Sequence, residues 1–281
     1  MSTISIWNYS IPLDWLSEPE ANYLRSLPAI LPTVDWVCSE LDSVWYGFNL
    51  DNHRELALQP IGAYYGHPVW LMNGIFSAQD PVSSLHRSAI AQYLKNLSVK
   101  VVADYGGGFG ELARKIVHAN ADTQVFVVEP YPSNVGVEQL RNESQIKIVP
   151  NLSGGMYEVI VAQDVLEHVE DPIKLASEIA TAVRIGGRII FANCFFPVIQ
   201  CHLPSTFHLR HTFPLVMKAL GLRFVGRVVG SEHAQVYERV GSINLNIARR
   251  AEILSRLVGP GFNHVHMFLS HIKGLVLRLY K

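Results

Sequence analysis

Residues 101–116, VVADYGGGFGELARKI, carry the clearest structural signal in the chain. An apolar run ends at Asp104, four glycines follow within the next six residues, and a helical pattern begins directly after them. This order predicts a buried strand, a tight turn and a helix. Glycine can take a positive φ and has no Cβ, so the turn can approach a ligand closely. Because the first N–H groups of the helix face the same space, we expect a cofactor there.

The spacing of the glycines argues against a dinucleotide. The fingerprint G-x-G-x-x-G needs a third glycine, or an alanine, where the helix packs on the strand. Counting from Gly106 puts Glu111 at that position, and counting from Gly108 puts Ala113 there, which is only the relaxed form. Glu111 would also repel a pyrophosphate at the positive helix end. The pattern suits a ligand with an ammonium group and a carboxylate, and an NAD-dependent oxidoreductase is the rival enzyme.

Four segments resemble, in family order, the motifs of class I S-adenosylmethionine (SAM) dependent methyltransferases. The first is acid-x-G-x-G-x-G from Asp104, and the second is an apolar strand that ends in Glu129. The third, residues 157–172, contains LEHV-x-DP, and the fourth is RIGGRIIF from Arg184. The resemblance covers roughly residues 99–230. It implies an α/β fold, a Rossmann-like doubly wound sheet of seven strands with a final antiparallel strand, and SAM as cofactor.

The resemblance also implies which residues bind SAM. In the family, the acid after the second strand bonds the ribose hydroxyls, and the acid after the first strand orients the glycine loop or meets the SAM ammonium. The usual acidic residue after the third strand is missing, so the neighbouring amide or backbone is expected to contact adenine. The expected cofactor contacts are Asp104, Tyr105, Gly106, Gly107, Gly108, Gly110, Glu129, Pro130, Asn151, Leu152, Gln163 and Asp164.

Composition agrees with an enzyme that has a large core. The chain has 281 residues, of which 49% are hydrophobic and 17% charged, so a core domain with an added part is expected. A net charge of −1 without a cluster of basic residues gives no indication of a surface that binds nucleic acid. Three cysteines without CxxC spacing argue against a disulfide framework or a zinc site. Without a leader or a long apolar run, a cytoplasmic protein with no membrane span is expected.

The pattern along the chain divides it into three regions. Residues 1–98, which include an aromatic stretch at 62–76 between turn residues, are expected to form a mostly helical cap that shapes the acceptor pocket. A packing extension or a dimer surface is the alternative. Residues 99–242 form the SAM-binding core. Residues 243–281 are expected to form a helical extension, broken at 259–261, that packs on the core or pairs in a homodimer, with a membrane-surface role as the less favoured alternative.

The core pattern alternates between strands and helices. Parallel pairing through right-handed crossovers is the economical topology, and the last two strands lie too close together for a crossover, so they should pair antiparallel. Strands are predicted at 99–104, 124–129, 145–150, 157–162, 188–194, 223–229 and 234–240. Helices are predicted at 109–120, 133–142, 171–184 and 212–221, with another at 84–97 ahead of the first strand.

Catalysis is expected to depend on histidine. Methyl transfer from a sulfonium needs an aligned acceptor and, if that acceptor is a hydroxyl, a group that takes its proton. Histidine suits this task near neutral pH. We expect His208 or His211 to be the base, and His168 is a further catalytic candidate for which a structural role is equally open. Contacts to the acceptor are expected from Tyr64, Tyr65, Trp70, His202 and Arg210.

The same histidines would also permit a divalent ion. Hard ions prefer oxygen ligands, and only Asp164 and Glu167 follow the fourth strand, so no metal is expected. Residues 163–166 lack the signature of amino-group methylases, and no Pro-Cys nucleophile is present. The expected acceptor is therefore a small molecule or a glycan, methylated at oxygen. A SAM-binding fold kept for interaction with a partner is the alternative outside enzymes.

Overall fold

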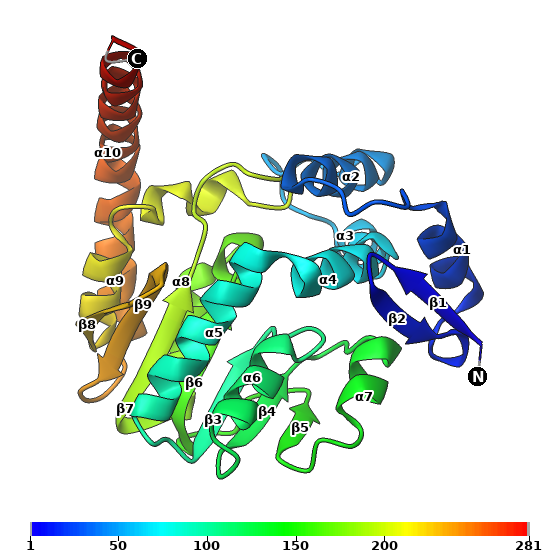
Figure 1. Ribbon diagram of the computed structural model, residues 1–281. Coiled ribbons are helices and arrows are strands. Elements are labelled where there is room, and N and C mark those ends of the chain that lie inside the picture. The colour runs from blue at the N-terminus through cyan, green and yellow to red at the C-terminus, as the bar shows by residue number, and fades with distance from the viewer. Residues whose placement is uncertain (1, 280–281) are drawn as a thin grey trace.

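A seven-stranded mixed sheet forms the centre of the molecule (Figure 1). The computed structural model describes the backbone of residues 2–279 and the side chains up to residue 266. The strand order is β5-β4-β3-β6-β7-β9-β8, and β9 runs antiparallel to both of its neighbours. The seven-stranded sheet with a final antiparallel strand is therefore confirmed. The strands are β3 (Val101–Tyr105), β4 (Gln124–Val128), β5 (Ile146–Val149), β6 (Tyr157–Gln163), β7 (Val183–Ala192), β8 (Leu222–Val228) and β9 (Ser231–Arg239).

Helices cover both faces of the sheet, because the parallel strands are apolar on both sides. On β3, Val102 faces α5 (Pro81–Asn96) and α6 (Glu111–Ala119). The next residue, Ala103, packs on the opposite side, where α8 (Pro172–Ala182) and α9 (Phe213–Leu220) lie. A further helix, α7 (Asn134–Leu140), lies near the β5 edge. This three-layer arrangement leaves the carboxyl ends of the strands free for a ligand.

The helix starts explain part of the LEHV-x-DP motif. Asp171 precedes α8, and its side chain accepts a hydrogen bond from the backbone N–H of Lys174. Pro172 occupies the first helical position, where its missing N–H costs nothing. Asp80 and Pro81 start α5 in the same way. The Asp-Pro pair of the motif therefore has a local structural role at the start of α8, whereas its Glu-His pair lies ahead of this helix.

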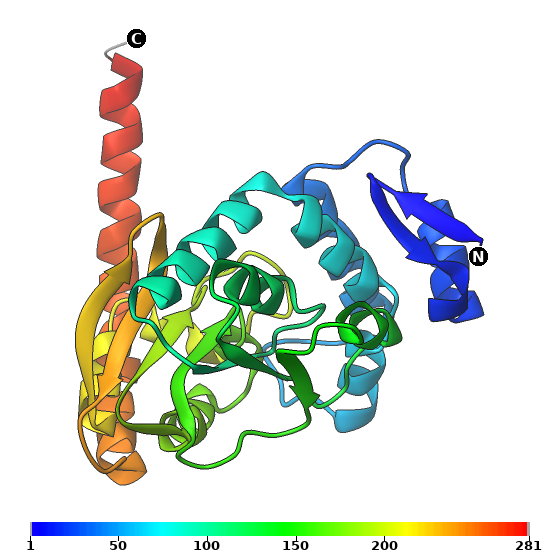
Figure 2. The ribbon, with the colours of Figure 1, turned by 60° about the horizontal axis from the view of Figure 1, so that its bottom comes forward.

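The first 80 residues form a cap at the end of the sheet where the parallel strands finish (Figure 1). Its helices are α1 (Glu18–Ser26), α2 (Val34–Gly47), α3 (Leu58–Tyr65) and α4 (Val69–Gln79). The aromatic stretch at 62–76 is therefore mostly helical. A hairpin of β1 (Thr3–Ile6) and β2 (Tyr9–Pro12) precedes them, at the opposite side of the molecule from the start of α10 (Figure 2).

This hairpin was not predicted. It turns on Trp7 and Asn8, which both have positive φ, at 50° and 68°. A two-residue turn of this kind normally uses Asn-Gly or Asp-Gly, so a Trp-Asn pair gives little signal. Trp7 is held because its side chain is buried and its indole N–H donates to the carbonyl of Pro28. Tertiary packing therefore stabilises a turn that the local sequence does not favour.

One helix, α10 (Leu245–Leu279), forms the end of the chain. The predicted break at 259–261 is wrong, because Pro260 lies inside the helix. The glycine before it has a packing role: a Cβ on Gly259 would lie 2.4 Å from the carbonyl oxygen of His208. The first part of α10 packs on α9, on α8 and on the 3-10 helix η3 (Pro204–Leu209). The last two residues of the predicted helical extension, 280 and 281, lie outside the described residues.

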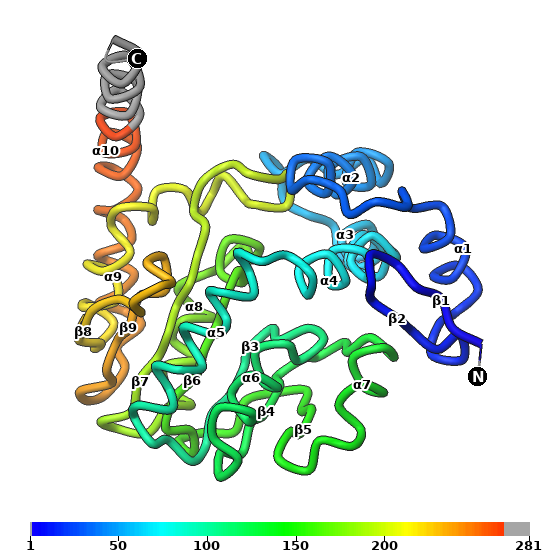
Figure 3. The backbone as a smooth tube through the Cα atoms, in the orientation of Figure 1, coloured from blue at the N-terminus to red at the C-terminus, as the bar shows by residue number. Residues whose placement is uncertain are grey.

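A long segment, residues 193–212, leaves β7 and returns to α9. It passes beside the cap before it reaches η3 (Figure 3). Two hydrogen bonds tie it there, since the backbone N–H of Gln200 donates to Asp42 and the amide of Asn52 donates to the carbonyl of Gln200. The segment therefore connects the cap with the C-terminal edge of the sheet. Among the described helices, none has the length and apolar character needed to cross a membrane.

Candidate cofactor and acceptor site

The glycine-rich turn joins β3 directly to α6. Gly106, Gly108 and Gly110 have φ values of 70°, 51° and 74°, in the left-handed region where side chains are strained. Gly110 is also the N-cap of α6, and its backbone closes the turn through a hydrogen bond to the carbonyl of Gly107. The turn thus leaves the start of α6 open toward the end of the sheet.

Asp104 lies beneath this turn and is almost completely buried. A Cβ on Gly107 would lie 2.6 Å from Oδ2 of Asp104, so the loop closes directly over the carboxyl group. That oxygen has no hydrogen-bond partner among the described residues. Burial raises the pKa of Asp104 to about 7, with Glu129 adding to the rise and Arg87 opposing it. The carboxyl group is therefore placed to brace the loop and to meet a cation.

The protonation of Asp104 should make stability depend on pH. Its folded pKa lies above the ordinary 3.8, so the folded chain holds this proton more tightly than the unfolded chain does. Without ligand, we expect this group to lower the unfolding free energy as pH rises from about 4 to about 7, by up to about 1 kcal/mol per pH unit. Urea unfolding over this range should show a flatter slope for Asp104→Asn. Equal slopes would contradict the assignment.

Glu129 follows β4 and faces the same turn. Burial raises the pKa of Glu129, and the nearby backbone N–H groups of Gly108 and Tyr131 oppose the rise. The carboxylate therefore lies beside the glycine loop, with Pro130 next in the chain. Two acidic groups from neighbouring strands thus meet at one loop.

The other expected cofactor residues follow β5 and β6. Asn151 and Leu152 line a cavity of about 420 Å³ together with Tyr105 and residues of α8. Asp164 has a φ of 53° and accepts a hydrogen bond from the Gln163 amide. Desolvation by the surrounding protein raises the pKa of Asp164, although part of its side chain is exposed to solvent. All expected cofactor residues therefore lie at or directly after the carboxyl ends of four adjacent strands, where ligands of such sheets bind.

A row of rings connects the cap to the end of β6. The ring centroids of Tyr65 and Trp70 are 5.1 Å apart, those of Trp70 and His168 6.3 Å, and those of His168 and His202 4.9 Å. Tyr64 is buried behind them, 5.5 Å from Trp70. Five of the expected acceptor and catalytic residues are therefore neighbours. They come from α3, α4, the 3-10 helix η2 (Leu166–His168) and the segment 193–212.

Arg210, the remaining expected acceptor contact, lies in a different setting. Its guanidinium group stacks over the ring of Phe196, 4.5 Å from the centroid. Both residues belong to the segment 193–212, so the contact holds two parts of that segment together. A cation over a ring contributes about 0.5–1 kcal/mol at an exposed site. This is a structural contact within the segment.

Glu167 is a functional candidate that sequence reasoning considered only as one of two acids, too few to form a site for a hard ion. Its side chain is completely buried, and one oxygen accepts a hydrogen bond of 2.7 Å from the backbone N–H of Cys194. Burial raises the pKa of Glu167 to about 8, and the charge of Asp164 adds to the rise. A glutamate just after a buried strand is itself the sequence signal, because an unpaired carboxylate there is costly.

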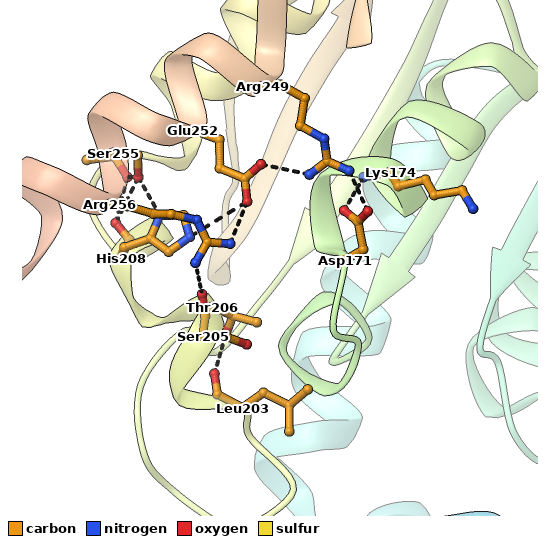
Figure 4. Close-up of polar contacts among 11 residues, drawn as sticks. Asp171, Lys174, Leu203, Ser205, Thr206, His208, Arg249, Glu252, Ser255 and Arg256 are labelled. Atoms are coloured by element: carbon orange, nitrogen blue, oxygen red, sulfur yellow. Dashed lines mark hydrogen bonds and ion pairs between the residues drawn. The ribbon is translucent and has the colours of Figure 1, made fainter. Parts of the chain in front are cut away.

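His208 lies in a separate polar cluster against α10 (Figure 4). Its Nδ1 is 2.7 Å from the hydroxyl of Ser255, which also contacts Thr212, and its Nε2 is 4.0 Å from Glu252. Burial lowers the pKa of His208 to about 4, helped by the charge of Arg256. These contacts join η3 to α10. The structure therefore groups His208 with α10 and not with the row of rings.

The same cluster anchors α10 to the core. Glu252 pairs with Arg249 and Arg256, and Arg249 also pairs with Asp171 at the start of α8 (Figure 4). His211, the other candidate base, lies beside His266 of α10 at a ring distance of 5.0 Å. Of the three expected catalytic histidines, only His168 belongs to the row of rings.

The arrangement defines a class of protein. A Rossmann-like sheet with a glycine turn after its first core strand, and acidic residues at the ends of the first two, is the architecture of class I SAM-dependent methyltransferases. Residues 82–208 match the family described as "Methyltransferase domain". This part of the chain therefore has the sequence pattern and the sheet topology of a methyltransferase domain of that class.

Sequence relatives support the family and differ from this chain in much of their length. A ubiquinone biosynthesis O-methyltransferase of Pectobacterium atrosepticum is 27% identical over 156 residues, which are 52% of this chain and 62% of the relative. The enzyme of the same description from Acinetobacter baylyi is 25% identical over 133 residues, 44% of this chain and 56% of the relative. The chain thus matches less than two thirds of either relative.

A solved structure supports the fold. The CurJ carbon methyltransferase aligns with a TM-score of 0.52 and 12% sequence identity, and the match covers 79% of this chain and 68% of that one. At such low identity the similarity concerns the architecture alone. The acceptor therefore has to be argued from the residues of this chain.

Proposed function

We propose that this chain transfers the methyl group of SAM to an oxygen atom of a small acceptor. The observation that carries the proposal is the turn at 106–110, which closes over Asp104 and has the backbone N–H of Gly108 near the carboxylate of Glu129. This pair of acids beside a glycine turn suits a cationic ligand with ribose hydroxyls and no phosphate. The relatives named as O-methyltransferases support oxygen as the methylated atom.

Within this proposal, each element supplies one part of the cofactor site. Glu129 accepts hydrogen bonds from the ribose hydroxyls, and the turn with Asp104 beneath it receives the methionine end. Asn151 and the backbone of Leu152 contact adenine, while Gln163 and Asp164 lie between cofactor and acceptor. SAM supplies the methyl group on a sulfonium, so the protein has to align the acceptor and manage its proton.

The acceptor side is formed by the row of rings from Tyr65 to His202. Flat apolar faces at Tyr65 and Trp70 suit a planar ring or the face of a sugar, and the imidazoles of His168 and His202 suit a hydroxyl on it. We therefore place the acceptor, a small molecule or a glycan, beside this row of rings. His168 replaces His208 and His211 as the preferred catalytic histidine because it alone adjoins this row.

The histidine assignment can be tested by comparing four alanine variants. His168→Ala and His202→Ala should lower turnover about 10²-fold or more if their imidazoles serve the acceptor hydroxyl, with affinity for S-adenosylhomocysteine unchanged. His208→Ala should instead lower the unfolding free energy, because Ser255 loses its partner, and His211→Ala should change little. The measurement is mass-spectrometric detection of methyl transfer from SAM to a panel of catechols, phenols and glycosides. Slower turnover in His208→Ala or His211→Ala alone would reverse the assignment.

The rival functions make different predictions in one titration series. An NAD-dependent oxidoreductase would bind NADH and not S-adenosylhomocysteine in isothermal titration. A fold kept only for interaction would bind S-adenosylhomocysteine, show no methyl transfer, and keep its biological effect in a Glu129→Ala variant. Binding of S-adenosylhomocysteine together with methyl transfer supports the proposal against both.

A further inference from the structure

Three potential metal ligands meet at the inner end of the row of rings. They are Glu167 and His168, on η2, and His202, on the segment 193–212. Each offers one ligand atom, and these atoms all lie within 4.8 Å of one another. The two imidazole rings are 4.9 Å apart and nearly perpendicular, at 80°. Residues far apart in the chain are thus brought to one point.

Both imidazoles are oriented by backbone carbonyl groups. Nδ1 of His168 is 3.1 Å from the carbonyl oxygen of Cys201, and Nδ1 of His202 is 3.0 Å from that of Phe196. A carbonyl oxygen can only accept, so each Nδ1 carries the hydrogen and each Nε2 keeps a free lone pair. Metal-ligating histidines are commonly held in this way, with the other ring nitrogen bonded to a carbonyl group.

The carboxylate of Glu167 has one satisfied and one free oxygen. Oε1 accepts from the N–H of Cys194, whereas Oε2 is buried and has no hydrogen-bond partner among the described residues. The backbone carbonyl of Glu167 accepts in turn from the N–H of Leu203, which fixes η2 against the segment 193–212. Because a buried oxygen without a partner is costly, the position favours a bound cation.

We propose that Glu167, His168 and His202 bind a divalent transition-metal ion, with zinc as the representative. Two imidazoles and one carboxylate are a common ligand set for such ions and leave further positions open. With bonds of about 2.1 Å, two ligands of a tetrahedral ion lie about 3.4 Å apart, so ligand atoms that are now up to 4.8 Å apart would close by about an ångström through side-chain rotation. Sequence reasoning favoured no metal because it weighed Asp164 and Glu167 for a hard ion.

The proposal has two levels. Ion binding stands on the three side chains alone. A role for the ion in catalysis rests on the proposed function: the open positions would take an acceptor oxygen, and the imidazoles would act as ligands and not as the base. His168 is the ring next to Trp70, so an ion held there lies at the acceptor side of the site.

Direct metal titration tests the proposal. The tag-free, chelator-treated protein is titrated with zinc in a calorimeter, and with Co²⁺ while its visible absorption is recorded. We expect one equivalent of ion and a Co²⁺ spectrum of low coordination number. Glu167→Gln and His202→Ala should each weaken binding by more than about 100-fold. His168→Asn is a third variant, and S-adenosylhomocysteine binding with circular dichroism checks that each variant folds.

A second histidine pair provides the control. The rings of His86 and His233 are 4.6 Å apart, and neither belongs to the described cluster of three metal-ligating groups. His233→Ala should therefore keep full zinc affinity. The proposal is overturned if the folded wild-type chain binds zinc no more tightly than Glu167→Gln and His202→Ala do, or if His233→Ala loses as much affinity. Ion binding without methyl transfer would contradict the proposed function alone. Methyl transfer by an ion-free protein would overturn the role of the ion in catalysis alone, because the metal titrations decide ion binding itself.

Discussion

Replacement of Glu129 by alanine should lower the affinity for S-adenosylhomocysteine by more than about 100-fold. The carboxylate is largely buried beside the glycine loop, with the N–H groups of Gly108 and Tyr131 nearby, so the proposed contact to the ribose forms in a sheltered place. Each hydrogen bond from a ribose hydroxyl to a charged acceptor contributes about 1.5–3 kcal/mol, and two of them together exceed the free energy of a 100-fold change. The loop also loses a partner at Gly108.

Isothermal titration calorimetry with S-adenosylhomocysteine measures this effect. Glu129→Gln should keep part of the affinity, because the amide oxygen can still accept one hydrogen bond. Glu18→Ala, on the exposed surface of α1, is the matched control and should bind like the wild type. A Glu129→Ala variant with undiminished affinity would remove this residue from the cofactor site and, with it, the proposed placement of the ribose.

The second large effect is expected where α10 crosses η3. Gly259→Ala should lower the unfolding free energy by about 2 kcal/mol, as overpacking of a close contact does. The added Cβ would lie 2.4 Å from the carbonyl oxygen and 2.9 Å from the Cα of His208. Both are backbone atoms, so neither can rotate away, and the helix has to shift from its seat. Urea denaturation followed by circular dichroism gives the change.

A neighbouring glycine in the same helix provides the opposite case. A Cβ on Gly261 would meet nothing within 4 Å. Alanine is favoured over glycine inside a helix by about 1 kcal/mol, so Gly261→Ala should raise the unfolding free energy. The two variants differ by two positions in sequence and should differ in sign. Equal effects would mean that α10 is not seated on the backbone of His208.

The sheet was predictable because its strands are short apolar runs bounded by turn residues. The observed β4 and β6 begin at the predicted residues, Gln124 and Tyr157. The strand predicted at 188–194 starts earlier, at Val183, because the Gly-Gly pair lies within the strand and does not precede it. The cofactor residues follow from the sheet, since a parallel arrangement brings the ends of its strands to one edge.

The acceptor side could be anticipated only in part. The LEHV motif pointed to His168, but its neighbour His202 lies 34 positions later, and only the return of the segment 193–212 brings them together. His208 belongs to the same sequence segment as His202 and yet packs on α10. Which histidine meets the site thus depends on the path of a loop that has little regular structure. Periodicity carries no information about such a path.

The segment 193–212 is bonded on both sides, to Asp42 and Asn52 in the cap and to Glu167 at the end of β6. Recombination between relatives would therefore have to keep this segment together with its partners on both sides. A chimera that exchanges residues 1–80 alone would leave Gln200 facing foreign partners, and the imidazole it helps to position at His202 would shift with it. We accordingly expect that new acceptor preferences in this architecture arise when the cap and the segment 193–212 are inherited together.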